Sequence, residues 1–380
     1  MFYDLRKDIK VRSYQHGDEE EIVQLLQLSF SAWPRLDLNC SGLDHWKWKY
    51  LENPYRDNYV GLGLLKKKII GVDHAIPNYI KIGDKIHLCS YGADVAVHPD
   101  YRRLGVYKRV REVRQKLADE AGVIINYHVT SNPIIIKNNI KAGRPYFPKK
   151  IINLVRINDI NEHIMNMPVK NAWYLKLGFV LSKKINELKN SFKKSAYQYN
   201  HLDITTVNEF DERITSFRNN ISNHYNFIVQ KSMNYMNWRY CDPRAGKFLV
   251  RQIEGENNEI LGYCVLSENR TPKGYTIGYV VDMLSLPERL DVADALVKDA
   301  VEYFDRKQVN IVNSLMVKNH PYEDIFMRHG FLNSRFELKL FYRLLRDEDI
   351  LDEVKKSPPS KIHFSYGDID SLPVSVPEYR

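Results

Sequence analysis

The residues with the clearest chemical potential form a short basic loop, Arg102-Arg103-Leu104-Gly105-Val106-Tyr107. An apolar run that ends in His98-Pro99 precedes this loop, and a helical pattern over 104–120 follows it. The free backbone N–H groups and the positive dipole end at a helix start can hold phosphate groups. Gly105 lets the backbone approach such a ligand closely. The loop therefore predicts a binding site for a pyrophosphate.

The elements that must position this loop are predicted from the periodicity of apolar residues. Alternation predicts strands over 9–14, 59–65, 68–76, 85–97, 123–129 and 151–157. A period of 3.6 with end signals predicts helices over 18–30, 43–50, 104–120 and from Pro133 to just before Gly143. Antiparallel strands that lead into a β-α-β-α-β order are typical of an α/β domain with a mixed, α+β type of sheet.

The sequence contains this domain twice. The matching anchors are Trp48-Lys49-Tyr50 with Trp238-Arg239-Tyr240, Gly71 with Gly262, Pro99 with Pro287, Asn132-Pro133 with His320-Pro321, and Gly143 with Gly330. Their offsets stay between 187 and 191 residues, which indicates one duplicated domain, because a solenoid repeats every 20–50 residues. We therefore predict domains over 1–157 and 200–345, a linker over 158–199 with a basic helical stretch at 177–195, and a C-terminal tail over 346–380.

The two copies differ at the basic loop. With an offset of 188, Arg102–Val106 corresponds to Leu290–Asp294, which contains two aspartates and no glycine. Carboxylates at this place repel phosphate groups. The sequence therefore predicts one phosphate site, in the first copy.

The first copy resembles the GNAT superfamily of acetyl-CoA-dependent N-acetyltransferases. The signature of that family is Arg or Gln, two residues, Gly, one residue, and then Gly or Ala; Arg102 and Gly105 fit it, and Tyr107 departs from it. The resemblance implies a tandem GNAT fold and acetyl-CoA as co-substrate, lying between the diverging ends of strands 85–97 and 123–129. It assigns cofactor contacts to Val95, Val97, Arg102, Arg103, Leu104, Gly105, Val106, Tyr107, Lys108 and Asn132.

The same resemblance implies acetylation of an amine, which needs a base for the ammonium proton and an acid for the leaving thiolate. Many members carry a Tyr four residues before the glycine that ends the second helix, where this chain has Asn139. Tyr127 or Tyr146 is then the candidate acid, unless the thiolate leaves unassisted. Asp94 and His128 are candidate bases; structurally, Asp94 would pair locally and His128 would pack in the core.

Aromatic residues near the start of each copy are candidates for a substrate pocket. We expect Trp46 and His74 to contact the substrate. Trp48 and Tyr50 recur in the second copy, where no chemistry is expected, so core packing is favoured for them.

Composition narrows the function further. Of the 380 residues 44% are hydrophobic and 27% charged, as in folded globular proteins. The net charge of +9 is spread over short basic runs, so nucleic-acid binding is not predicted. The four cysteines lack paired spacing and predict neither disulfides nor a metal site. With no apolar run of about 18 residues and no signal peptide, a cytoplasmic chain without a membrane span is expected.

These observations favour an N-acetyltransferase whose acceptor is a small primary amine, by preference an amino sugar, either free or nucleotide-linked. Two alternatives stay open. One is an aminoacyl transferase of the Fem type, against which the intact Arg102–Gly105 loop argues. The other is a sensor or scaffold that binds acyl-CoA without turnover, which the missing helix Tyr would explain.

Overall fold

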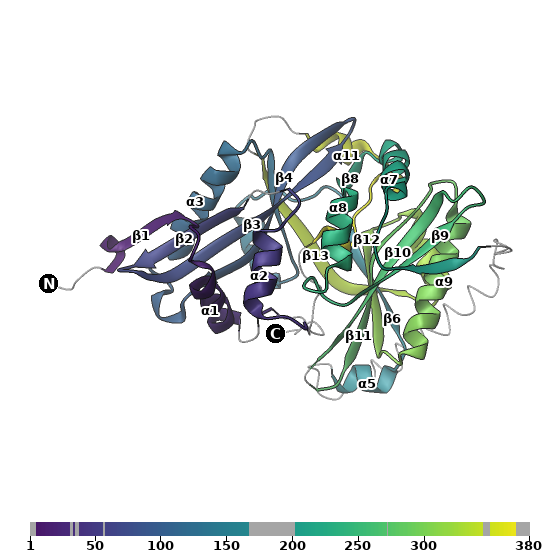
Figure 1. Cartoon of the computed structure of the whole chain (residues 1–380), viewed down its shortest axis with the longest axis horizontal. Coiled ribbons are helices and arrows are strands. Elements are labelled where there is room, and N and C mark those ends of the chain that lie inside the picture. The colour runs from purple at the N-terminus through teal and green to yellow at the C-terminus, as the bar shows by residue number, and fades with distance from the viewer. Residues whose placement is uncertain are drawn as a thin grey trace.

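The computed structural model describes residues 5–30, 33–34, 38–55, 58–166, 202–271, 273–344 and 350–369. The basic helix predicted over 177–195 lies outside these residues. Across these ranges none of the helices is long and apolar enough to cross a lipid bilayer. Figure 1 shows two lobes side by side, the first built mainly from the first copy of the repeat and the second mainly from the second copy.

The first copy follows the predicted order of elements. These are β1 (Ile9–Ser13), α1 (Glu19–Phe30), α2 (Gly42–Tyr50), β2 (Tyr59–Leu65), β3 (Lys68–Ile82), β4 (Lys85–Val97), α3 (Val106–Glu120), β5 (Ile125–Thr130), α4 (Pro133–Lys141) and β6 (Ile151–Ile157), followed by the short helix α5 (Ile160–Met165). Their ends lie within a few residues of the predicted ones, except that β3 continues to Ile82.

The second copy repeats this order. Its elements are β7 (Ile204–Val207), α7 (Arg213–His224), β8 (Phe227–Gln230), α8 (Met233–Met236), β9 (Phe248–Glu254), β10 (Ile260–Arg270), β11 (Thr276–Ser285), α9 (Leu290–Arg306), β12 (Ile311–Val317), α10 (Pro321–Arg328) and β13 (Leu332–Leu344). A short helix, α11 (Asp352–Lys356), follows. The predicted mixed sheet and tandem duplication are confirmed.

Glycines allow one helix of each lobe to lie close to the sheet. A Cβ atom on Gly71 would lie 2.4 Å from the side chain of Val106, at the start of α3. A Cβ atom on Gly262 would lie 2.7 Å from Val292 in α9. Because the two glycines are repeat partners, Val106 and Val292 occupy equivalent places. This contact fixes the start of each helix over its sheet.

The last strand of each copy completes the sheet of the other lobe. β6 pairs with β12, and the second part of β13 pairs with β5. The first part of β13 pairs with β6, so the sheet is continuous, in the order β1-β2-β3-β4-β5-β13-β6-β12-β11-β10-β9-β7. β13 accordingly crosses between the lobes in Figure 1. The boundary predicted at residue 157 divides the sequence repeat, but it does not divide the two lobes in space.

The repeated Trp-x-Tyr tripeptides meet where the lobes touch. Trp48 stacks on Trp238 with ring centroids 4.6 Å apart. Each indole N–H donates to the backbone carbonyl of the other tryptophan at 3.0 Å. These reciprocal contacts are those of an internal pseudo-twofold axis. The packing role expected for Trp48 is confirmed by its burial.

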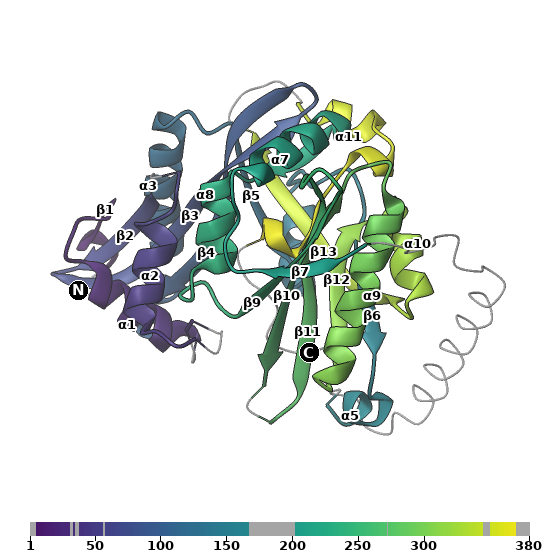
Figure 2. The ribbon, with the colours of Figure 1, turned by 45° about the vertical axis from the view of Figure 1, so that its right-hand side comes forward.

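The part of the predicted tail that the structure describes is packed against the second lobe. In Figure 2 the chain after α11 turns back into the molecule. Ile362, Phe364 and Tyr366 are all buried there. Residues 362–369, called the C-terminal segment below, therefore belong to the core.

Candidate functional site

Strands β4 and β5 run side by side for only three residue pairs and then diverge. Parallel pairing extends from Cys89–Ile125 to Tyr91–Tyr127, after which β4 continues to Val97 and β5 to Thr130. The pairing with β3 skips one position, so that Asp94 and Val95 lie opposite a single residue. Asp94 has φ +41°. Such a bulge bends a strand, which opens a cleft toward the starts of α3 and α4.

The basic loop joins β4 to α3 at the end of this cleft. Gly105 is the N-cap of α3 with φ +79°, and no side chain caps the helix. A Cβ atom on Gly105 would meet nothing within 4 Å, so the loop is open. Arg102, Arg103 and Lys108 are exposed around it. Uncapped N–H groups surrounded by three cations are suited to an anion such as a pyrophosphate.

The other predicted cofactor contacts have more varied positions. Val95 is 37% exposed on β4. Val106 is buried against the sheet, so only its backbone faces the loop. The Tyr107 hydroxyl accepts a hydrogen bond from Arg111 at 2.7 Å. Asn132 caps α4, with its Oδ1 accepting the Ile134 N–H at 2.9 Å. Val97 and Leu104 are half-buried beside the loop.

The corresponding loop of the second copy is shorter than the sequence alignment assumes. Val292 takes the place of Val106, an offset of 292 − 106 = 186 instead of 188. Asp291 therefore stands at the place of Gly105, which corrects the earlier match of this glycine with an alanine. Its carboxylate accepts a hydrogen bond from Arg289 at 2.7 Å. A carboxylate in place of glycine still disfavours a phosphate at this helix start.

The C-terminal segment occupies most of the cleft of the second lobe. Residues Ile362–Ser365 lie between β11 and β12 and line the small cavity that remains there. The His363 Nε2 atom lies 3.2 Å from the carbonyl oxygen of Met283, and the Tyr322 hydroxyl accepts the Ser285 N–H at 2.9 Å. These two residues of β11 correspond, by the offset of 188, to the cofactor contacts predicted on β4. The second cleft is thus occupied by the chain itself.

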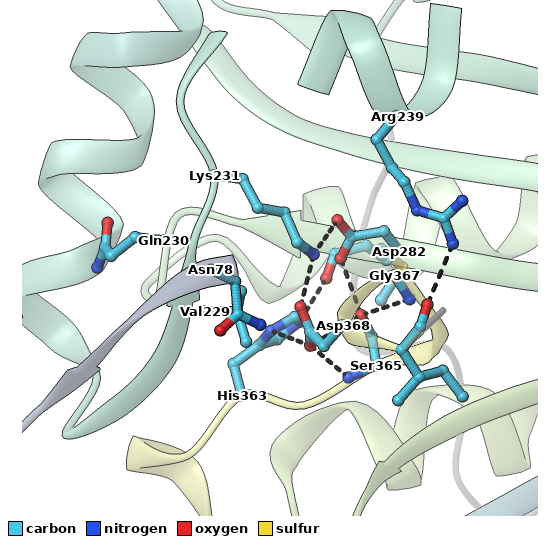
Figure 3. A network of polar contacts seen from close by, with 12 residues as sticks. Asn78, Val229, Gln230, Lys231, Arg239, Asp282, His363, Ser365, Gly367 and Asp368 are labelled. Atoms are coloured by element: carbon cyan, nitrogen blue, oxygen red, sulfur yellow. Dashed lines mark hydrogen bonds and ion pairs between the residues drawn. The ribbon is translucent and has the colours of Figure 1, made fainter. Parts of the chain in front are cut away.

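A buried polar network holds this segment in place, as Figure 3 shows. The Lys231 ammonium lies 2.8 Å from Asp282 and 2.7 Å from Asp368. The Ser365 hydroxyl donates to Asp282 at 3.1 Å, and the Arg239 guanidinium donates to the carbonyl oxygen of Ile369 at 3.1 Å. All three groups of the ion pair are at most 1% exposed. Since buried charges require partners, the segment and the network depend on each other.

Asp94 is bound by its neighbours on α2. The Lys49 ammonium and the Tyr50 hydroxyl each donate to its Oδ2 at 2.6 Å. Burial alone would raise the pKa of Asp94, but Lys49, His74 and these hydrogen bonds outweigh it and hold that pKa well below its usual value. The carboxylate is therefore a weak proton acceptor. The local pairing foreseen as its structural role is present.

Trp46 and His74, expected to contact the substrate, lie away from the cleft surface. Both side chains are fully buried. The Trp46 indole donates to His74 Nε2 at 3.0 Å, and His74 Nδ1 lies 2.9 Å from the Asp94 carbonyl oxygen. Burial lowers the pKa of His74 to about 4. This geometry corrects the expectation, because the pair supports the bulge at Asp94 instead of facing a ligand.

Tyr127 lies at the point where the strands separate. Its ring packs edge-on against Tyr91, with centroids 5.3 Å apart. Its hydroxyl accepts a hydrogen bond from the Asn78 side-chain amide and lies 3.4 Å from the Asp368 carbonyl oxygen. Burial raises the pKa of Tyr127 well above its usual value, so the hydroxyl keeps its proton at neutral pH.

His128 points to the opposite face of β5, because side chains alternate along a strand. Its ring stacks on Phe341 of β13, with centroids 5.7 Å apart, and its Nε2 lies 3.3 Å from the Asn139 amide. Burial, with Arg111 and further arginines, lowers the pKa of His128 to about 4. The structure therefore does not bring Asp94, Tyr127 and His128 together in one cluster.

A small cavity between the lobes is lined by Asn78 and Tyr91, which both contact Tyr127, and few signals in the sequence point to it. Its lining includes Trp48, Lys49, Asn78, Tyr91, Arg239 and Asp368. Of these residues, Lys49 could be singled out in the sequence only by its place in the repeated tripeptide. Asn78 appears only as a polar residue within a strand, and Asp368 falls in what looks like a tail. We call this space the inter-lobe cavity.

The first lobe contains a domain of the GNAT superfamily. Residues 10–134 match the family model described as an acetyltransferase (GNAT) domain, which covers the divergent strands and the basic loop. The first lobe is therefore a GNAT acyltransferase domain, and acyl-CoA is the co-substrate typical of these enzymes. This confirms the family resemblance and the enzyme class.

Solved structures match the fold over most of the chain. N-myristoyltransferase of Saccharomyces cerevisiae, solved with bound myristoyl-CoA and inhibitors, aligns with a TM-score of 0.59 at 11% identity over 96% of this chain and 87% of that one. A GCN5-related N-acetyltransferase from Anabaena variabilis aligns with a TM-score of 0.54 at 13% identity over 89% and 73%. A probable N-acyltransferase from Enterococcus faecalis aligns with a TM-score of 0.60 at 10% identity over 91% and 74%. These likenesses concern the fold. The sequence has no significant match among curated proteins.

Proposed function

We propose that the first lobe binds acetyl-CoA and transfers its acetyl group to the primary amine of a small acceptor, an amino sugar that is free or nucleotide-linked. One observation carries the proposal. The cleft between β4 and β5 leads directly to an open, uncapped and basic helix start, whereas the matching cleft is filled by the chain itself.

The cofactor would extend from the helix start into the cleft. Its pyrophosphate would bind the N–H groups after Gly105 together with Arg102 and Arg103. Its pantetheine arm would follow the part of β4 that no longer pairs with β5, past Val97 and Val95. The thioester would then lie near Tyr127, where the strands separate. A backbone N–H of the bulged strand would polarise the thioester carbonyl.

The acceptor ammonium must first lose a proton, after which its nitrogen attacks the thioester carbon. The C–N bond forms, the C–S bond breaks, and the nitrogen gives up a second proton. The leaving thiolate takes a proton from Tyr127, whose hydroxyl is protonated, and the second proton of the nitrogen would restore that hydroxyl. His128 is uncharged at neutral pH but faces away from Tyr127 across β5, so it would take the first proton through a water molecule; Asp94 is bound by Lys49 and is the weaker base.

The inter-lobe cavity has room for a group about the size of a water molecule, so it would take the amino group of the acceptor and not the sugar ring. Aromatic rings from both lobes, including Trp48, Tyr91 and Tyr235, line it and would lie against that end of the acceptor.

The test is acetyl transfer by the whole chain to a panel of amines. Acetyl-CoA would be mixed with D-glucosamine, a nucleotide-linked amino sugar, ethanolamine or lysine, with thiol release measured and products weighed by mass spectrometry. We expect release that depends on the amino sugar and a product heavier by one acetyl group. Saturable acetyl-CoA binding with no release for any amine would contradict this function.

That contrary result would favour a protein that binds acyl-CoA without turning it over. Two observations support this second candidate. Asn139 occupies the place of the usual tyrosine of α4, buried against His128, and Asp94 is engaged by Lys49 and Tyr50. The panel separates the two functions because both require cofactor binding and only one requires release.

A further inference from the structure

One polar atom in the wall of the inter-lobe cavity has no partner among the residues that the structure describes. Asn78 lies on β3 and is 5% exposed. Its amide nitrogen donates to the Tyr127 hydroxyl, but no hydrogen bond reaches its Oδ1 atom. In Figure 3 this side chain extends from β3 toward the group around Asp368. A buried acceptor without a donor costs roughly 1–3 kcal/mol, so the missing donor is a notable feature of this wall.

The surroundings of Asn78 restrict what that donor can be. The cavity is narrow and has room near this wall for a group about the size of a water molecule. The neighbouring Tyr127 hydroxyl is directed at the Asp368 carbonyl oxygen, 3.4 Å away. The Lys231 ammonium is held between two carboxylates. A donor for Oδ1 must therefore come from outside the described chain.

We propose that Asn78 positions the acceptor, with its Oδ1 accepting an N–H of the attacking amino group. The inference rests on the proposed function and deepens it. Through its bond to Tyr127, Asn78 adjoins the place where β4 and β5 separate, which is where the thioester would lie. One side chain would then contact the acceptor nitrogen through Oδ1 and the acid Tyr127 through Nδ2.

This arrangement also selects for the chemical class of the nucleophile. An amine that attacks the thioester still carries N–H hydrogens, so its bond to Asn78 persists through the reaction. An alcohol loses its only O–H hydrogen as it attacks, which leaves Oδ1 unpaired again. Asn78 therefore favours amines over alcohols as nucleophiles.

The test compares Asn78→Leu with Asn78→Asp, which keeps an acceptor oxygen. In Asn78→Leu we expect the KM for D-glucosamine to rise about tenfold or more, with the KM for acetyl-CoA unchanged. In Asn78→Asp the KM for D-glucosamine should stay near that of the wild type or fall. Asn269→Leu is the matched control, because Asn269 is also buried with an unpartnered side-chain atom but lies on β10, outside the cavity lining.

A structural role for Asn78 would give a different result. If Asn78→Leu lowers the melting temperature of the free protein and leaves the KM for D-glucosamine unchanged, Asn78 merely supports Tyr127 and the inference is overturned. If wild type releases no thiol with any amine, the proposed function fails. The inference is then judged by the melting temperature of the CoA-saturated protein with D-glucosamine. Equal shifts of this melting temperature in wild type and Asn78→Leu, or no shift in either, would overturn the inference. Finding that only a water molecule binds Oδ1 would overturn it as well.

Discussion

The two clefts of this molecule are formed by the same arrangement of strands and helix, and they differ in what occupies them. Each lies between two parallel strands that separate beside a β-bulge, and each leads to a helix placed over a glycine. In the first lobe the helix start is open and basic. In the second lobe Asp291 blocks it and the C-terminal segment fills the space. The second cleft is part of the core, and the first is the one in which we propose that a ligand binds.

The Tyr–Asp pairs of the two lobes show the same divergence. Tyr50 donates to Asp94 at 2.6 Å, and its repeat partner Tyr240 donates to Asp282 at 3.0 Å. The side chain of Asp94 is 15% exposed beside the open cleft, whereas that of Asp282 is fully buried. The same pair therefore borders the proposed ligand site in one lobe and anchors a packed segment in the other.

The largest effect is expected on stability, from Lys231→Met. This change leaves Asp282 and Asp368 without their shared cation in a fully buried place, which should lower the free energy of unfolding by about 3–5 kcal/mol. Lys49→Met should cost clearly less, because water can reach Asp94. Urea unfolding of both variants measures the difference. Equal losses of unfolding free energy would show that the ion pairs of Lys231 and Lys49 are buried to the same extent.

Gly105→Glu should weaken acetyl-CoA binding by about 3 kcal/mol. The variant places a carboxylate where phosphate is expected and a side chain at φ +79°. Asp291→Glu, at the equivalent place in the second lobe, should leave the affinity unchanged. Calorimetry should find one site per chain in the wild type. Two equivalent sites per chain would show that both clefts bind the cofactor and would contradict the prediction.

Tyr127→Phe should slow acetyl transfer about 10²-fold with little change in acetyl-CoA affinity, because the thiolate loses its acid. Its counterpart by strand register is Asn313 in the second lobe, which has no hydroxyl to lose. Asp94→Asn and His128→Gln test the remaining candidate bases. The variant that slows turnover by 10²–10⁴-fold and removes the acidic limb of the pH profile identifies the base. Near-normal turnover in both would assign that step to water.

The smallest effect concerns pH and the buried His74 beside the bulge. Its folded-state pKa of about 4 lies below the unfolded value, so between pH 6.5 and 4 the unfolded chain binds the extra proton. Stability is then complete above pH 6.5 and falls with decreasing pH, by about 1.4 kcal/mol per pH unit for one such histidine. His74→Gln should flatten this slope by about one proton in urea unfolding. An unchanged slope would mean that His74 is protonated in the folded state.

The sequence predicts the local features well and the long-range ones poorly. The strand over 151–157 is predicted correctly. Its pairing with the second lobe is not predicted, because its residue pattern is satisfied by the edge of either sheet. The basic loop was found because its residues are contiguous. Asn78, Lys49 and Asp368 were missed as a group because they come from distant elements. The offset of 188 is wrong by two residues at the loop, because the true offset of 186 follows only from the contact between Gly262 and Val292.

The strand exchange has a consequence for how the protein is made. The sheet of the first lobe is closed by β13, and the core of the second lobe by the C-terminal segment, so both lobes need residues from the last part of the chain. A growing chain on the ribosome can form the early helices and hairpins, but it exposes an open edge at β5 until β13 has been made. We expect chains that stop before β13 to aggregate or be degraded, which ties accumulation of the first lobe to translation of the second copy of the repeat.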